Sequence, residues 1–158
     1  MRQALAPAIW LVAAASAQIA LSERIGLGFA RPDFLLLCSI FLSLRSEING
    51  AAAVGFFAGF LHGAVLNASL GMLVASRTLT AVIASKLFSA LIDPGPFTAA
   101  LVVGACSLFA GILALFLGSP QNILGHLAAT IGTAIYNAVL AVPVYWLTVR
   151  TARAGARG

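Results

Sequence analysis

Apolar residues recur along almost the whole chain in long runs, and each run ends at a short polar interval. These intervals are SERIGLGFARPD, RSEIN, NAS, DPGP and GSPQN, and four of the six prolines lie in or beside them, where a residue without a backbone N–H is tolerated. A helix that crosses a bilayer needs about 20 apolar residues. The pattern predicts six helices, over residues 5–21, 34–44, 50–66, 70–92, 97–117 and 123–149.

The second of these runs, residues 34–44, is too short for a simple crossing. At a rise of about 1.5 Å per residue, a helix of this length covers roughly half of the hydrocarbon core. We therefore expect it to be tilted, extended back through Phe29, or buried by its neighbours. The sequence thus predicts an all-α, six-helix transmembrane bundle with a short second helix, and one transmembrane domain over residues 1–158.

Composition supports a membrane protein. The 158 residues are 61% hydrophobic and 8% charged, whereas soluble domains are roughly half apolar and a quarter charged. The net charge of +5 indicates lipid headgroups as partners of the basic residues rather than nucleic acid, because those residues lie at the ends of the apolar runs. Cys38 and Cys106 lie inside apolar runs without CxxC spacing, so we interpret them as packing residues and expect no disulfide, metal site or cofactor.

The first 22 residues also resemble a signal peptide, with Arg2, an apolar core and Ala15-Ser16-Ala17 as a possible cleavage site. We favour a retained helix because the apolar run continues past that site and further runs follow. Six crossings with the amino end in the cytoplasm place an excess of Arg and Lys on the cytoplasmic side, which favours cytoplasmic location of both termini. Tyr145 and Trp146 precede Arg150 as an aromatic and basic anchor at that interface, and Arg45 is a further cytoplasmic anchor.

The stretch GFFAGFLHGAVLNASLG carries small or polar residues at every fourth position. Glycines at this spacing form a groove on one helix face, into which a second backbone can pack closely. The groove is used either within the bundle or by a helix of a separate chain, and the spacing alone does not separate the two. The predicted packing residues are Gly55, Gly59, Gly63, Asn67 and Gly71.

Several polar residues fall inside the predicted spans. Arg77 lies about two turns into the fourth run, where it is either a functional charge or one that extends its side chain to the interface, and we take the second interpretation. His62 and also His126 are interpreted as structural residues that bond to a neighbouring carbonyl or hydroxyl. Asn137 is expected to face the bundle, because an amide is costly against lipid.

A catalytic constellation is not evident in the sequence. The four acids, Glu23, Asp33, Glu47 and Asp93, lie at the margins of the runs, where we expect them to be solvated. The sequence contains no P-loop and no nucleophile elbow, and two distant histidines do not make a metal site. We therefore do not expect an enzyme.

The order of these motifs resembles the bacterial rod shape-determining protein MreD family. The resemblance rests on RPDFLLLCSIFLSL, the glycine-rich block and the closing NAVLAVPVYWLTVR, and it spans nearly the whole chain. Arg31, Pro32 and Asp33 match the start of the second span, and Asn137 and Pro143 match the closing motif. The chain departs from the family at Gly63, near which family members often carry an aspartate.

This resemblance implies a multi-pass protein of the bacterial inner membrane that takes part in cell elongation and the regulation of peptidoglycan synthesis. Its implied partners are MreC, the transglycosylase RodA and the penicillin-binding transpeptidase of RodA, and it implies no catalysis. The family is also similar in its six-helix arrangement to the substrate-binding subunits of energy-coupling-factor vitamin transporters. A small-solute or vitamin-binding transporter subunit is therefore the main alternative, and a self-associating structural protein or small channel is a third.

Overall fold

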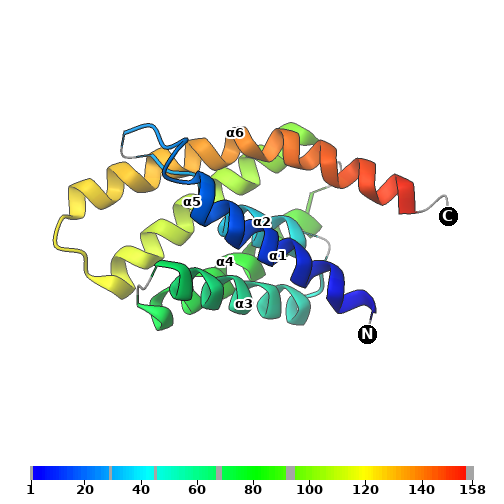
Figure 1. Cartoon of the computed structure of the whole chain (residues 1–158), viewed down its shortest axis with the longest axis horizontal. Coiled ribbons are helices and arrows are strands. Elements are labelled where there is room, and N and C mark those ends of the chain that lie inside the picture. The colour runs from blue at the N-terminus through cyan, green and yellow to red at the C-terminus, as the bar shows by residue number, and fades with distance from the viewer. Residues whose placement is uncertain (1, 29, 45, 67–68, 92–94, 156–158) are drawn as a thin grey trace.

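A computed structural model describes residues 2–28, 30–44, 46–66, 69–91 and 95–155 of the chain (Figure 1). The described residues form six helices and so confirm the predicted all-helical fold with a short second helix. The largest differences from the predicted bounds are that the first helix begins three residues earlier, the fourth ends three residues earlier and the sixth continues six residues further. The helices are α1 (Arg2–Leu21), α2 (Phe34–Ser43), α3 (Ile48–Leu66), α4 (Leu70–Ser89), α5 (Pro96–Gly118) and α6 (Ile123–Gly155).

Four helices in the described part of the chain are long and apolar enough to cross a membrane. Their apolar stretches are Ile48–Val65, Leu70–Ser89, Pro96–Gly118 and Ile123–Leu147, whereas those of α1 and α2 are shorter. These helices expose many large apolar side chains, such as Phe97 and Phe116. A bundle with this outer surface is consistent with a multi-pass membrane protein, whose outer face meets lipid rather than water.

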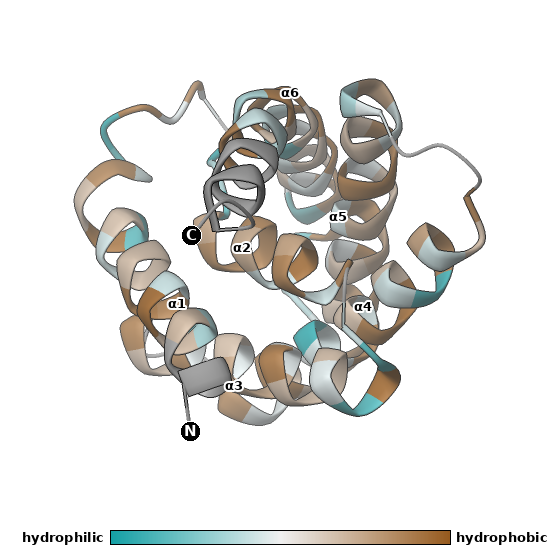
Figure 2. Cartoon of the chain, turned by 90° about the vertical axis from the view of Figure 1, so that its right-hand side faces the viewer, coloured by the Kyte–Doolittle hydropathy of each residue, from teal (hydrophilic) through white to brown (hydrophobic). Residues whose placement is uncertain are grey.

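The short helix α2 occupies the centre of the bundle. It contacts all five other helices, and the view along the bundle shows it surrounded by them (Figure 2). One side of α2 packs with α4, α5 and α6 through residues such as Ile40, Val103 and Ala141, and another side packs Leu35 against α1 and α3. Of the three expectations for this segment, burial by neighbouring helices is the one that the structure supports.

The glycine-rich face of α3 lies against α4. A Cβ added at Gly55 would come within 2.6 Å of the Arg77 carbonyl oxygen, and one at Gly59 within 2.6 Å of the Leu73 carbonyl oxygen. Gly63 is looser, at 3.2 Å from the Cα of Leu70. Because only a residue without a Cβ permits this approach, these glycines form a seam within the chain.

Gly71 departs from the expected packing role. A Cβ added there would meet no atom within 4 Å, because Gly71 lies on α4 itself, in its exposed first turn, rather than on the face of α3 that carries the other glycines. Asn67, the remaining member of the predicted set, lies outside the described residues.

The seam predicts opposite effects for two glycine substitutions. Gly59→Ala should lower the free energy of unfolding by about 1–3 kcal/mol, because the new methyl group overlaps the α4 backbone. Gly71→Ala should leave stability unchanged or raise it by up to about 1 kcal/mol, since alanine favours helix and has room there. Denaturant unfolding in detergent, followed by circular dichroism, measures both variants. Equal stability of the two would contradict the seam.

Candidate functional site

The amino end of α2 lies inside the bundle rather than at its surface. The first four N–H groups of any helix have no partner within the helix, and in an apolar interior each needs one from elsewhere. The segment between α1 and α2 leads into this end and is fastened to α6 by two hydrogen bonds. Tyr136 donates to the Ile25 carbonyl over 2.9 Å, and Thr133 donates to the Arg31 carbonyl over 2.9 Å.

Side chains from two helices and from the N-cap residue supply acceptors for the N–H groups at this buried end. The N–H of Asp33 donates to Asn137 Oδ1 over 3.1 Å, and that of Phe34 donates to Gln18 Oε1 over 2.8 Å. The N–H of Leu36 donates to Asp33 Oδ1 over 2.8 Å, so Asp33 is the N-cap of α2. The end of α2 is thus bonded to α1 through Gln18 and to α6 through Asn137.

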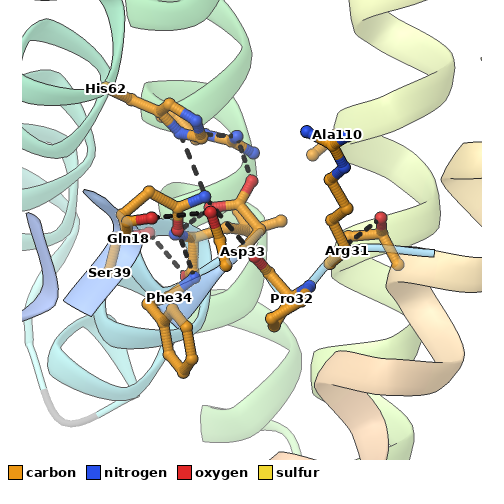
Figure 3. A network of polar contacts seen from close by, with 12 residues as sticks. Gln18, Arg31, Pro32, Asp33, Phe34, Ser39, His62 and Ala110 are labelled. Atoms are coloured by element: carbon orange, nitrogen blue, oxygen red, sulfur yellow. Dashed lines mark hydrogen bonds and ion pairs between the residues drawn. The ribbon is translucent and has the colours of Figure 1, made fainter. Parts of the chain in front are cut away.

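The Asp33 carboxylate also joins two charged or ionisable residues of α3 and α4. Arg77 Nη2 donates to Asp33 Oδ2, and the same nitrogen lies 3.0 Å from His62 Nδ1 (Figure 3). His62 Nδ1 lies 3.5 Å from Asp33 Oδ1. We call Asp33, His62 and Arg77 the ionic cluster. It links α2, α3 and α4 at one point.

The ionic cluster is deeply buried. The relative exposure is 9% for Asp33, 4% for His62 and 6% for Arg77. A buried ion pair is costly to desolvate, and removal of one partner leaves an uncompensated charge that destabilises the protein strongly. Arg77 has no acceptor atom, so its bond to His62 requires an unprotonated Nδ1 and a neutral imidazole with its proton on Nε2.

Arg77 Nε is a buried nitrogen without a hydrogen-bond partner among the described residues. Nη2 of the same guanidinium bonds to Asp33 and His62. Ser76 beside it donates to the Ala110 carbonyl over 3.5 Å, which ties α4 to α5 at the same level. The arrangement fixes the positions of the helices that it joins.

Two sequence-based expectations are wrong at this site. Asp33 was expected to be a solvated margin residue, but the loop before α2 turns back into the bundle and buries it. Arg77 was expected to reach the interface, but it pairs with Asp33 because the central α2 brings a carboxylate within reach. His62 also has this carboxylate as a neighbour, 29 positions away in sequence (62 − 33), instead of only a carbonyl or hydroxyl.

Asn137 does face the bundle as predicted, with an exposure of 0%. Its Nδ2 donates to Ser107 Oγ over 3.1 Å, so α5 joins the network. Gln18 was missed by the sequence analysis, although an amide inside the first apolar run was a usable signal of the same kind as Asn137. Ser107 carried no comparable signal, since single serines are common in apolar helices.

The other predicted site residues lie away from the ionic cluster. His126 Nε2 lies 2.9 Å from the Gly111 carbonyl, a structural bond of the expected type. Tyr145 and Trp146 meet edge to face with ring centroids 6.4 Å apart, and Trp146 is exposed. Arg45 lies outside the described residues, as does the side chain of Arg150, although α6 extends through that position.

Outside the ionic cluster, the acidic side chains of the described residues do not form a second site. Glu23 and Arg31 form an exposed ion pair at 3.2 Å, as expected for margin charges. Within the described ranges, no group of three or more His, Cys, Asp or Glu side chains is placed to hold a metal ion. The ionic cluster and the end of α2 are therefore the candidate functional site.

Comparison of the chain with protein-family models, with curated proteins and with solved structures found no match. The fold and site define the class, an all-helical protein whose four long apolar helices are consistent with several membrane crossings.

The buried ion pair predicts a non-additive mutant cycle. Asp33→Asn keeps an N-cap oxygen but leaves Arg77 without its counter-charge, so it should lower the free energy of unfolding by about 3–5 kcal/mol. Asp33→Asn combined with Arg77→Met should be more stable than the sum of the single changes predicts. Glu23→Gln, in the exposed pair, is the control and should change stability by less than about 1 kcal/mol. Additive single effects in detergent unfolding would contradict the ion pair.

The anchoring of α2 predicts a local change in hydrogen exchange. Asn137→Leu removes the acceptor of the Asp33 N–H. It should lower the free energy of unfolding by about 1–3 kcal/mol and speed hydrogen exchange at the start of α2. Hydrogen–deuterium exchange followed by mass spectrometry reads peptides that cover residues 33–37. Ser16→Ala, which removes an exposed bond to the Val12 carbonyl, is the control and should leave these peptides protected. Unchanged protection in Asn137→Leu would show that α2 is held in another way.

Proposed function

We propose that this protein is a non-enzymatic scaffold of the bacterial inner membrane that belongs to the cell-elongation machinery, as its resemblance to the MreD family implies. In this proposal it holds a transmembrane segment of an MreC-like protein and positions the transglycosylase RodA with its penicillin-binding transpeptidase. Both termini lie in the cytoplasm, and the lipid bilayer is a further partner.

One observation carries the proposal: the polar interior is bonded to the protein's own backbone and side chains. Arg77 bonds to both Asp33 and His62, while Gln18 and Asn137 bond to backbone N–H groups at the start of α2. Polar groups used in this way fix the positions of helices. A bundle with fixed helix positions can present a constant outer surface to several partners, which is what a scaffold requires.

The glycine-rich block offers further support. Family members often carry an aspartate near the position of Gly63, and this chain lacks it. Here Asp33, the N-cap of α2, brings a carboxylate to within 3.5 Å of Nδ1 of His62, the residue next to Gly63. A carboxylate thus lies near the position at which MreD family members often carry an aspartate, but it comes from the start of α2 instead of from α3. This is compatible with membership of the MreD family.

The outward face of α3 is the surface on which we place a partner helix. Its glycines are occupied by α4, whereas Phe56, Phe57 and Phe60 are exposed by 47%, 57% and 46%. The rings of Phe56 and Phe57 meet edge to face with centroids 5.6 Å apart. Aromatic side chains are common anchors of protein interfaces, because they bury a large area at a low entropy cost.

A small-solute or vitamin-binding subunit, similar to those of energy-coupling-factor transporters, is the alternative. Such a subunit would need a cavity in which polar groups converge on the solute. The apolar groove of about 330 Å³ between α1, α2 and α6 is lined by other residues than those of the ionic cluster. A larger cavity of about 650 Å³, lined by Glu47, Asn49 and Lys86 among others, also excludes the residues of the ionic cluster. The ionic cluster thus lines neither cavity and is left to hold the helices together, which favours the scaffold.

Recovery of partners from native membranes tests the proposal. In mild detergent the wild-type chain should copurify with an MreC-like protein, RodA and the transpeptidase. Phe57→Ala with Phe60→Ala should lower that recovery about tenfold or more, as loss of interface anchors does. Leu101→Ala, at an equally exposed site on α5, is the control and should recover partners normally.

Two results would contradict the scaffold. One is a chain that emerges alone from native membranes in mild detergent. The other is a vitamin or similar solute that mass spectrometry finds in the purified protein at one molecule per chain, which would favour the transporter subunit.

A further inference from the structure

A groove of about 330 Å³ opens on the side of the bundle between α1 and α6. Over the described residues α1 and α6 do not pack against each other, and the view along the bundle shows α2 in the space between them (Figure 2). The floor of the groove is α2, through Phe34, Cys38 and Phe41. Trp10 and Ala13 of α1 line one wall, and Val144 and Leu147 of α6 line the other.

The groove ends near the part of the bundle where basic residues begin. The amino end of α1 and the carboxyl end of α6 lie at the same end of the molecule (Figure 1). The apolar stretch of α6 ends at Leu147, but the helix continues through Arg150 and Arg153 to Gly155. At about 1.5 Å per residue these two positions lie about one and two helical turns beyond the groove. Arg2 is the first residue of α1.

The size of the groove separates a hydrocarbon chain from a helix as its occupant. A helix about 10 Å across and 15 Å long, the length of α2, has a volume of roughly 1,200 Å³. The groove has only about 330 Å³. A single flexible chain can fill such a space, whereas a helix exceeds it and would lie largely outside the groove.

We propose that the groove between α1 and α6 binds an anionic phospholipid, with one acyl chain against α2 and the headgroup at the basic ends of α1 and α6. The apolar lining matches the acyl chain, and the arginines that follow it match a negative headgroup. This inference is independent of the proposed function, because a scaffold and a transporter subunit could each have such a site.

Tryptophan fluorescence tests the site directly. The chain has two tryptophans, so Trp146→Phe leaves Trp10, which lines the groove, as the reporter. The protein is placed in phosphatidylcholine vesicles that contain lipid with brominated acyl chains, which quench indole on contact. Brominated phosphatidylglycerol should bind at Trp10 at least about fivefold more strongly than brominated phosphatidylcholine, the factor expected from about one basic residue near the surface.

Two sets of variants separate the headgroup from the groove. Arg150→Gln with Arg153→Gln should remove most of the preference for phosphatidylglycerol, so that the two brominated lipids bind almost equally. Ala13→Phe should fill the groove and abolish the preference, whereas Ala20→Phe, at an exposed position of the same helix outside the groove, should retain it. If Ala13→Phe does not fold by circular dichroism, Val144→Phe fills the groove from α6.

Three outcomes would overturn the proposal. Equal quenching by the two lipids would mean that ordinary bilayer lipid fills the groove. A preference that survives Ala13→Phe would place the anionic lipid elsewhere. Absence of quenching by both lipids would mean that protein, such as a second copy of the chain, covers Trp10. Copurification of the elongation partners would be unaffected by any of these results.

Discussion

The need to satisfy the buried amino end of α2 shapes this protein more than any other constraint. Helix ends in soluble proteins use water, but the start of α2 lies in the middle of a bundle whose outer surface is apolar. Its N–H groups therefore need acceptors from neighbouring helices. Gln18, Asn137 and the Asp33 carboxylate meet this need from α1, α6 and the cap itself.

The ionic cluster follows from the same constraint. A carboxylate that caps a buried helix carries a charge into the interior, and that charge requires a counter-ion. Arg77 provides it from α4, and His62 of α3 lies beside both. The glycine seam then has a second consequence, because the close approach of α3 to α4 keeps His62 near Arg77. Backbone packing and charge pairing thus support one another at one level of the bundle.

The central position of α2 also explains the two outer features to which we assign binding. Since α2 fills the middle, the other helices form an incomplete ring, and the space between α1 and α6 becomes an apolar groove with α2 as its floor. On the opposite side of its glycine seam, α3 presents exposed phenylalanines. The polar interior fixes the helices, and the outer surfaces remain available for lipid and protein.

The hydrophobic pattern by itself determined the helical class, six helices with bounds close to the observed ones, the small-residue face of α3 and the inward orientation of Asn137. These are local properties, since the length of an apolar run, the spacing of glycines and the presence of an amide within a run each depend on the sequence of a single helix. The tertiary structure alone decided that Asp33 and Arg77 are buried and paired with each other. Both stand at positions that look solvated or near an interface in sequence, and their 44-residue separation conceals the pair. Only the return of the segment before α2 into the bundle brings them together, and that path depends on contacts with α6 that no local pattern encodes.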